Sequence, residues 1–181
     1  VRGEYLEVKS GDRKFINLYE DGTLIAKALA DNDFLGWGRG DAEFLSKPRL
    51  NPVALIEFTY SFVDFYRKLV PHFEAKPRAV RFRADLRNTF VGDTKLYLIP
   101  FGTNTFAWLT DDERYHAPDN NMLRELELPI EELEESSAHV AYKLIEKIYL
   151  WFGLEPQKIP YTAEDEKHSR FIDVEKLRTL G

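Results

Sequence analysis

The sequence predicts an α+β fold in which two main helices pack on one face of an antiparallel sheet. Short segments with strand character alternate in order with two longer segments whose apolar residues recur every three or four positions. Strands that alternate between apolar and polar residues bury only one face, so we expect both helices to cover that face. Typical domains contain roughly 100 to 150 residues, so the whole chain, residues 1–181, is expected to form a single domain.

The composition indicates a folded domain with one buried core. Hydrophobic residues make up 44% of the chain and aromatic residues 14%, which supplies enough apolar surface to oppose the chain entropy lost on folding. No apolar run approaches the roughly 20 residues that a membrane-spanning helix needs, and no signal peptide precedes the first strand. We therefore expect a cytoplasmic location and no membrane partner. The start at Val1 instead of a methionine favours a domain excised from a longer chain.

Charge and cysteine content exclude several classes of function. The chain has 25 basic and 31 acidic residues, which gives a net charge of -6. A phosphate backbone would repel such a domain unless its cations cluster on one surface. The absence of cysteine excludes disulfides, thiolate metal sites and cysteine nucleophiles.

Three strands are expected near the N-terminus. Residues 5–9 alternate as a short strand. Residues 15–19 and 23–29 are expected to form the two arms of a hairpin, because Asp21 and Gly22 between them tolerate a positive φ.

The first long helix is expected to start after Asn51. Asn51 is a good N-cap residue, and Pro52 suits the first helical position. An apolar stripe with helical spacing follows and runs to the neighbourhood of Pro71: Leu55, Phe58, Phe62, Phe65 and Leu69. Residues 31–48, before this helix, contain several glycines and no sustained period, so they are expected to form a long loop.

The clearest alternation along the chain covers residues 78–87. Arginines and an aspartate alternate there with apolar residues, which predicts a half-buried strand. Residues 96–99 are expected to pair with it through a turn at Gly92 and Asp93, and residues 106–109 to add a further edge strand. Residues 111–121 are expected to form a polar loop.

The second long helix follows an acidic stretch. Ser136 or Ser137 is expected to cap it, and Gly153 to mark its end. Its apolar stripe has helical spacing: Ala141, Leu144, Ile145, Ile148, Trp151 and Phe152. A short helix is expected at residues 173–180.

Three arginines form the first candidate binding site. Arg81, Arg83 and Arg87 are expected on one exposed sheet face, where guanidinium groups offer paired donors to a phosphate or a carboxylate. Asp85 lies among them and neutralises part of their field. The alternative is an ordinary exposed face with cross-strand ion pairs. If nucleic acid binds this domain, we expect it to bind through this face.

Glu7 and Lys9 form the second candidate site. Their side chains leave the same side of the first strand, because they are two residues apart. Together with Ser10 and Gly11 they resemble part of the strand motif of a family of metal-dependent nucleases. The resemblance implies that the carboxylate holds a divalent ion and that the lysine steadies the attacking water or the phosphate. Those nucleases also carry an aspartate on a preceding strand, for which this chain has no room.

No cofactor is expected. The glycines of residues 36–40 fit neither the dinucleotide-binding nor the Walker spacing, and the histidines form no pair with zinc-ligand spacing. His116 lies among carboxylates that in principle can hold a metal, although polar loops of this kind are usually explained by solvation: Asp111, Asp112, Glu113 and Asp119.

The layout of three stretches resembles that of a known family. These are the hairpin at residues 16–23, the long apolar helix from Pro52, and residues 128–130 leading into a helix that closes on residues 151–154. The arrangement is similar to the region that follows the DNA-binding module in bacterial Schlafen/AlbA-like proteins. The resemblance implies an accessory C-terminal domain with a binding or scaffolding role, and it transfers no functional residue to this chain.

These observations favour a non-catalytic binding or protein-interaction module of a larger bacterial protein. Its partner would be another protein or the remainder of its parent chain. The first alternative is a fragment of a metal-dependent nuclease, with Glu7 and Lys9 as half of the site. The second is a small-molecule sensor with a pocket between helix and sheet, although the aromatic residues expected to line it are more often plain core: Phe58, Phe62, Phe82 and Tyr97.

Overall fold

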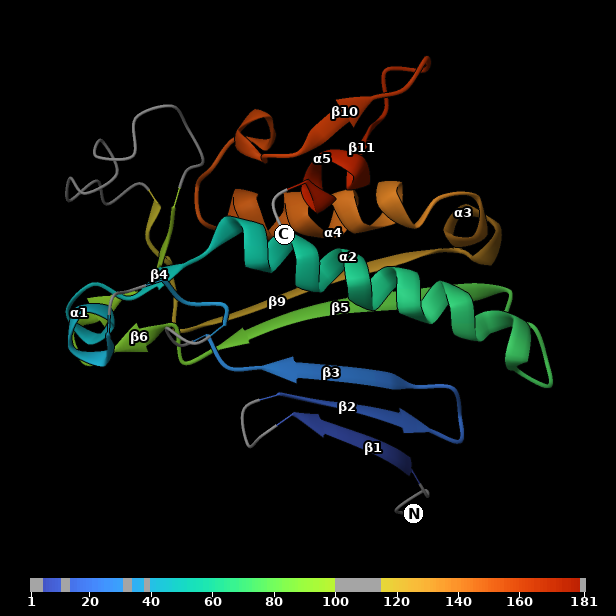
Figure 1. Ribbon diagram of the computed structural model, residues 1–181, viewed down its shortest axis with the longest axis horizontal. Helices are drawn as coiled ribbons and strands as arrows, with labels where there is room; N and C mark the ends of the chain where they lie inside the picture. The colour runs from blue at the N-terminus through green and yellow to red at the C-terminus, as the bar shows by residue number, and fades with distance from the viewer. Residues whose placement is uncertain (1–4, 11–13, 31–33, 38–39, 100–114, 180–181) are drawn as a thin grey trace.

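The computed structural model describes residues 5–10, 14–30, 34–37, 40–99 and 115–179 (Figure 1). Helices and antiparallel strands both occur within these ranges, which confirms the predicted α+β class. The strands form a three-stranded sheet and several two-stranded sheets instead of one continuous hydrogen-bonded sheet. The two long helices, α2 (Pro52–Leu69) and α4 (Ser137–Trp151), lie side by side on one face of the longest strand pair.

An antiparallel meander forms the N-terminal sheet. It consists of β1 (Tyr5–Ser10), β2 (Lys14–Tyr19) and β3 (Leu24–Ala28), in that spatial order. The predicted hairpin is confirmed, since β2 pairs with β3 across a turn in which Gly22 has a φ of 81°. A side chain rarely adopts this backbone conformation, which explains the need for glycine there.

Helix α2 begins where the sequence predicts. The Asn51 side chain accepts hydrogen bonds from the backbone N–H groups of Val53, at 2.9 Å, and Ala54, at 3.3 Å. Two of the N–H groups that lack partners within the helix are thereby satisfied. The helix ends at Leu69, where a short 3₁₀ turn, η1 (Val70–His72), takes over at a proline.

The longest strand pairing differs from the prediction. Strand β5 (Ala79–Arg87) pairs antiparallel with β9 (Asn121–Pro129) along its whole length, and not with residues 96–99. Within that stretch β8 (Tyr97–Leu98) pairs in parallel with β4 (Arg49–Leu50). Residues 96–99 are all buried and have no polar side to present to solvent, so an enclosed position suits them better than a half-exposed sheet.

The expected turn at Gly92 and Asp93 is present, but it closes only a small hairpin. Two short strands, β6 (Phe90–Val91) and β7 (Thr94–Lys95), pair across it. The residues expected to add an edge strand, 106–109, lie outside the described residues. Of the expected polar loop, residues 111–114 lie outside the described residues, and Asn121 already belongs to β9.

A short helix interrupts the segment that was expected to be a loop. Helix α1 (Asp41–Ser46) forms within residues 31–48 and buries Phe44. The carboxylate of Glu43 in α1 accepts a 2.6 Å hydrogen bond from Arg49, which is itself buried. The sequence shows no helical period here because a six-residue helix is too short to display one.

The C-terminal third contains the second long helix and a small hairpin. Helix α3 (Ile130–Glu135) follows β9 directly, and Ser136 caps α4 by accepting a hydrogen bond from the backbone of His139. Helix α4 ends before Gly153, which has a φ of 76°. The chain then forms a 3₁₀ turn and three short elements: η4 (Pro156–Lys158), β10 (Thr162–Glu164), β11 (Arg170–Ile172) and α5 (Val174–Arg178).

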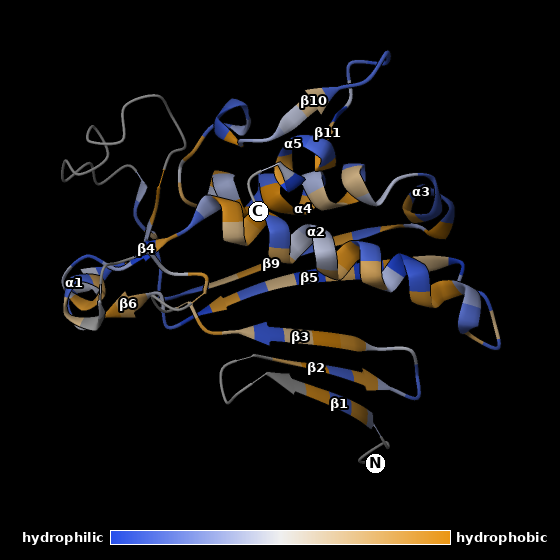
Figure 2. Cartoon of the chain, viewed as in Figure 1, coloured by the Kyte–Doolittle hydropathy of each residue, from blue (hydrophilic) through white to orange (hydrophobic). Residues whose placement is uncertain are grey.

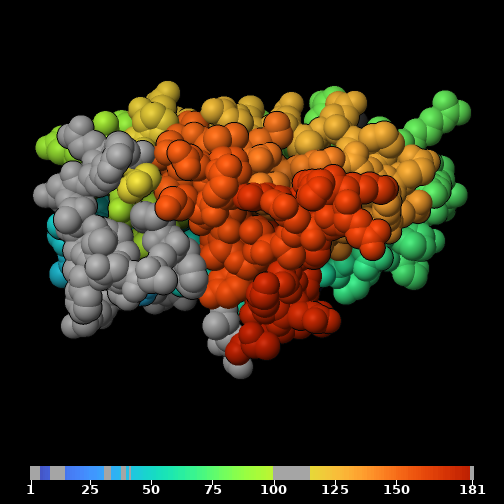
Figure 3. Space-filling model, turned by 90° about the horizontal axis from the view of Figure 1, so that it is seen from above, coloured from blue at the N-terminus to red at the C-terminus, as the bar shows by residue number. Residues whose placement is uncertain are grey.

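The core lies between the two long helices and the β5–β9 pair. Apolar residues on the inner side of these strands are buried there, among them Phe82 and Met122. The hydropathy colouring shows that α2 and α4 carry hydrophobic stripes (Figure 2). Seen from above, α4 and the residues that follow it, coloured orange to red, occupy the middle of the molecular surface (Figure 3). No helix among the described residues is both long enough and apolar enough to span a membrane.

Candidate docking surface

The arginine face predicted from the sequence forms on the outer side of β5. Arg81, Arg83 and Arg87 are all exposed there. The antiparallel register places Glu127 opposite Arg81 and Glu125 opposite Arg83. These glutamates stand on the neighbouring strand, more than forty residues away in sequence, so two of the three arginines have an acidic residue directly opposite, whereas Arg87 stands opposite Asn121.

Direct ion pairs engage two of these arginines. Arg81 donates to a single carboxylate oxygen of Glu127, at 2.8 Å from Nη2 and 3.1 Å from Nε. Arg87 donates from Nη2 to Asp85 on its own strand, at 2.7 Å. The hydrogen bond from Arg87 holds the pKa of Asp85 below its ordinary value, and the charges of Arg87, Arg83 and Lys27 act in the same direction. This geometry favours the cross-strand ion-pair interpretation. Ligand binding by the three arginines stays a prediction.

Glu7 and Lys9 lie on β1, the outermost strand of the N-terminal sheet. Glu7 pairs in register with Asn17, and Lys9 with Phe15. Among the residues that the structure describes, no group of three His, Cys, Asp or Glu side chains is arranged to hold a metal ion. Three of the carboxylates expected around His116 lie in the segment 111–114, outside the described residues. The nuclease role of Glu7 and Lys9 stays a hypothesis.

A serine, a histidine and an aspartate meet at the start of α4. His139 Nδ1 lies 2.8 Å from Ser136 Oγ, and His139 Nε2 lies 3.2 Å from Asp165 Oδ2. Ser136 and Asp165 also accept hydrogen bonds from the backbone. Ser136 caps α4, and Asp165 accepts from the N–H groups of Lys167 and Ser169. The arrangement therefore fastens the β10–β11 hairpin to the helix. Sequence reasoning missed it because Asp165 is remote in the chain.

One side of the N-terminal sheet is apolar, and we call it the β1–β3 apolar face. The register places seven aliphatic residues on this side: Leu6, Val8, Ile16, Leu18, Leu24, Ala26 and Ala28. Hydrophobic colouring appears on all three strands in Figure 2. Alternate residues of a strand share a side of the sheet, so the face follows from the sequence once the register is known.

Exposure on the β1–β3 apolar face rises strand by strand. Leu24 on β3 is 9% exposed, Ile16 on β2 is 37% exposed, and Val8 and Leu6 on β1 are 60% and 66% exposed. Strand β3 lies nearest to β5 and α2 in Figure 1, whereas β1 lies at the outer edge. The cover provided by α2 therefore ends part-way across the sheet.

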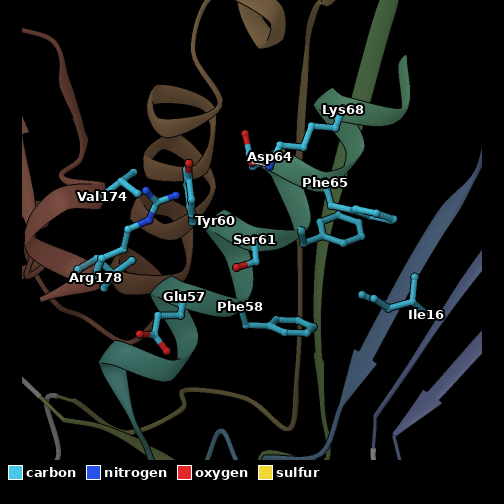
Figure 4. A pocket seen from close by; sticks show the side chains of 13 residues that line it. Ile16, Glu57, Phe58, Tyr60, Ser61, Asp64, Phe65, Lys68, Val174 and Arg178 are labelled. Carbon is cyan, nitrogen blue, oxygen red and sulfur yellow. Dashed lines mark ion pairs between the residues drawn. The ribbon is translucent and has the colours of Figure 1, made fainter. Parts of the chain in front are cut away.

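A cleft of about 620 Å³ adjoins this face. Ile16 and Ala26 of the apolar face line one side of it, and Val174 and Arg178 of α5 line the other. The outward residues of α2 lie between them, and Figure 4 shows Phe58 and Phe65 on the side toward Ile16. Phe65 is 43% exposed. The cleft and the apolar face are therefore one continuous surface, which shares Ile16 and Ala26.

The four aromatic residues of the expected sensor pocket separate into two groups. Phe58 and Phe62 line the cleft. Phe82 and Tyr97 are buried, and Phe82 meets the ring of Phe62 edge-on with 6.3 Å between ring centroids. The structure therefore brings two of the predicted residues to a concave surface and places the other two in the interior.

Asp64 is the most buried acidic side chain at the cleft. Its carboxylate accepts hydrogen bonds from Ser137 at 2.9 Å and from Arg67 at 2.9 and 3.1 Å, and it forms a 2.7 Å ion pair with Lys68. Burial acts to raise the pKa of Asp64, but the hydrogen bonds from Lys68, Arg67 and Ser137 together keep the pKa below its ordinary value. The carboxylate is therefore ionised and paired. Most of the other residues that line the cleft are apolar, beside the charged Glu57, Lys68 and Arg178.

Comparisons with known proteins give no match. No family model, no curated protein and no solved structure matches this chain. The resemblance to the region after the DNA-binding module of bacterial Schlafen/AlbA-like proteins therefore stays a prediction.

Proposed function

We propose that this domain is a non-catalytic protein-interaction module of a larger bacterial protein. Its docking surface is the β1–β3 apolar face together with the adjoining cleft over α2. The partner is another protein or the remainder of the parent chain. The bacterial context is carried by the layout resemblance alone, whereas the docking surface is supported by the exposure of named residues.

The observation that carries the proposal is the stepwise exposure of the apolar face. Leu24 is almost fully buried, while Leu6 and Val8 on the same side of the same sheet are more than half exposed. Removing one Leu or Val side chain from water stabilises an assembly by about 1.5 to 3 kcal/mol. Contiguous apolar patches with polar surroundings mark interaction sites on soluble proteins. A partner that covered this side would continue the layer that α2 begins.

A photo-crosslinking amino acid in the full-length parent protein tests this proposal. Placed at Leu6 or at Phe65, it is expected to yield discrete protein adducts in the native host. Leu150 provides the matched control, because it is an exposed leucine on α4 outside the docking surface. Equal labelling at all three positions, or no adduct at Leu6 and Phe65, would show that the surface is not a docking site.

The cleft also supports a second candidate function, the binding of a small molecule. Its volume of about 620 Å³ lies within the range of about 300 to 1,000 Å³ that is usual for ligand sites. Phe58 and Phe62 give it aromatic walls. This function predicts that an apolar compound raises the melting temperature of the chain.

A cleft-filling variant separates this second candidate from non-specific binding. Ser61 lines the cleft on the outer side of α2, so Ser61→Trp is expected to occupy the space without disturbing the core. A compound that stabilises the wild-type chain and not this variant binds in the cleft. A compound that stabilises both equally binds elsewhere, and this candidate function would then have no support.

A further inference from the structure

Strand β1 is the edge of its sheet. It pairs with β2 on one side, and no described residue pairs with it on the other. Its register with β2 runs without interruption from Tyr5 to Ser10, and it contains no proline. An edge of this kind presents backbone N–H and C=O groups that can pair with another strand. Natural proteins usually protect such edges by proline, bulges or charged residues.

The charges of β1 are complementary to a second copy of the same strand. An antiparallel pair centred on Val8 places Glu7 of one copy opposite Lys9 of the other, twice by symmetry. Oppositely charged residues that stand directly opposite each other stabilise strand pairs. Lys9 alone would discourage pairing at this edge, but the glutamate two residues earlier makes the edge self-complementary.

Neighbouring registers lack this complementarity. A pair centred on Glu7 sets two glutamates opposite each other, and a pair centred on Lys9 sets two lysines opposite each other. A register whose centre falls between two residues sets the apolar residues of one β1 strand opposite the polar residues of the other, so the two apolar faces would lie on opposite sides of the joined sheet. Only the register centred on Val8 joins like faces and also matches the charges.

We propose that two copies of this chain join edge to edge through β1, in antiparallel register centred on Val8, and so form a six-stranded sheet. This inference deepens the proposed function and rests on it, because it names a second copy as one partner. The two-fold axis is perpendicular to the sheet, so both β1–β3 apolar faces lie on the same side. Val8, now 60% exposed, gains the valine of the second copy as its direct neighbour.

Single cysteines test this register directly. The chain contains no cysteine, so Val8→Cys introduces the only thiol. Directly opposite residues of antiparallel strands have Cα atoms about 4.5 to 5.5 Å apart, which is within the reach of a disulfide. Mild oxidation of the purified 181-residue chain is therefore expected to convert Val8→Cys into a covalent dimer.

Leu6→Cys is the matched control. Leu6 is on the same strand and the same face, and at 66% it is at least as exposed as Val8. In the proposed register it stands opposite Ser10 of the second copy, so two cysteines at position 6 lie about 14 Å apart and cannot be bridged. A mixture of Leu6→Cys and Ser10→Cys chains is expected to cross-link. Equal cross-linking of Val8→Cys and Leu6→Cys alone would overturn the register.

Charge reversal gives an independent readout by analytical ultracentrifugation. Glu7→Lys alone and Lys9→Glu alone each place like charges opposite each other at two symmetric contacts. We expect each to weaken dimerisation by about tenfold, and the double variant to restore the wild-type value. The melting temperature of each variant shows that the chain remains folded. Failure of the double variant to restore association would contradict the proposal.

The results distinguish this inference from the proposed function. A wild-type chain that stays monomeric at high concentration, with no disulfide from Val8→Cys, excludes the β1 dimer. Crosslinks from Leu6 in the parent protein to a chain of different mass would then still support docking of another protein. Crosslinks from Leu6 only to a second copy of the parent, together with the Val8→Cys dimer, identify the second copy as the partner.

Discussion

Asp64 on α2 accepts a 2.9 Å hydrogen bond from Ser137 Oγ at the first residue of α4. The two residues are 73 positions apart in the chain, and both are buried. Arg67 and Lys68 bind the same carboxylate from one turn further along α2. This contact therefore fixes the N-terminus of α4 against the middle of α2, at the place where the cleft opens.

We expect Asp64→Asn to lower the free energy of unfolding by about 1 to 3 kcal/mol at neutral pH, because the charged acceptor of three donors is lost. The folded-state pKa of Asp64 lies below its ordinary value, so its contribution is fully present above about pH 4 and is lost as the pH falls through the folded-state pKa. Urea unfolding from pH 7 to pH 2 is the measurement. Ser137→Ala removes one donor only and should cost less. An Asp64→Asn chain as stable as the wild type at pH 7 would show that the carboxylate is not a structural link.

Tyr149→Phe is expected to stabilise the protein. Tyr149 is fully buried, and no described residue offers its hydroxyl a hydrogen-bond partner. Removing an unsatisfied buried hydroxyl is expected to raise the free energy of unfolding by about 1 kcal/mol, or the melting temperature by about 2 to 4 °C. Calorimetry measures the change. A lower melting temperature would indicate that this hydroxyl has a partner in solution.

Gly22→Ala is expected to destabilise the β2–β3 hairpin by about 1 kcal/mol. The cause is backbone strain at a φ of 81°, because a Cβ atom there would meet the ring of Phe73 at an ordinary contact distance of 3.6 Å. Gly22→Asn is the control, since asparagine tolerates positive φ better than alanine. Equal losses for the two variants, measured by chemical denaturation, would point to a steric cause instead.

The arginine face yields a prediction about nucleic acid. Glu125 and Glu127 oppose Arg83 and Arg81 in the β5–β9 register, so the face carries little net positive charge. The wild-type chain is therefore expected to bind duplex DNA weakly, and the double variant Glu125→Gln/Glu127→Gln to bind it more tightly and with a steeper salt dependence. Fluorescence anisotropy at several salt concentrations measures both. Tight wild-type binding that Arg81→Ala abolishes would instead assign the face to a nucleic-acid partner.

Loss of the His139–Asp165 contact is expected to loosen the β10–β11 hairpin locally. His139→Ala should increase amide hydrogen exchange in residues 162–172 more than in α2, because the contact joins this hairpin to α4. Asp165→Asn should have a similar effect, since Asp165 also accepts from the backbone of its own turn. A uniform rise in exchange across the chain would indicate global destabilisation instead.

Local features of the fold could be predicted from the sequence, whereas strand partners could not. Asn51 and Ser136 cap the two long helices as expected, because capping depends on residues within one turn. Strand β5 was predicted from its alternation, but its partner β9 was not. Residues 96–99 are also apolar and lie nearer to β5 in the sequence, so they were the expected partner. Sequence proximity was a poor guide because residues 96–99 are buried on all sides.

The candidate surfaces show the same limit. The sequence placed Arg81, Arg83 and Arg87 on one exposed face, and the structure agrees. It did not reveal Glu127, which lies 46 residues from Arg81 and pairs with it. The docking surface was also missed, because each strand of the meander has ordinary alternation. Only the position of α2 relative to β1 and β3 shows which apolar residues are left uncovered.

The β5–β9 ladder pairs Arg87 with Asn121, so the chain segment between them starts and ends at the same end of this strand pair. Doubling the length of such a segment costs only about 0.6 kcal/mol of closure entropy. An insertion at the exposed turn of Gly92 and Asp93 within this stretch is therefore expected to cost little stability, and the N-terminal meander would keep its shape through such a change.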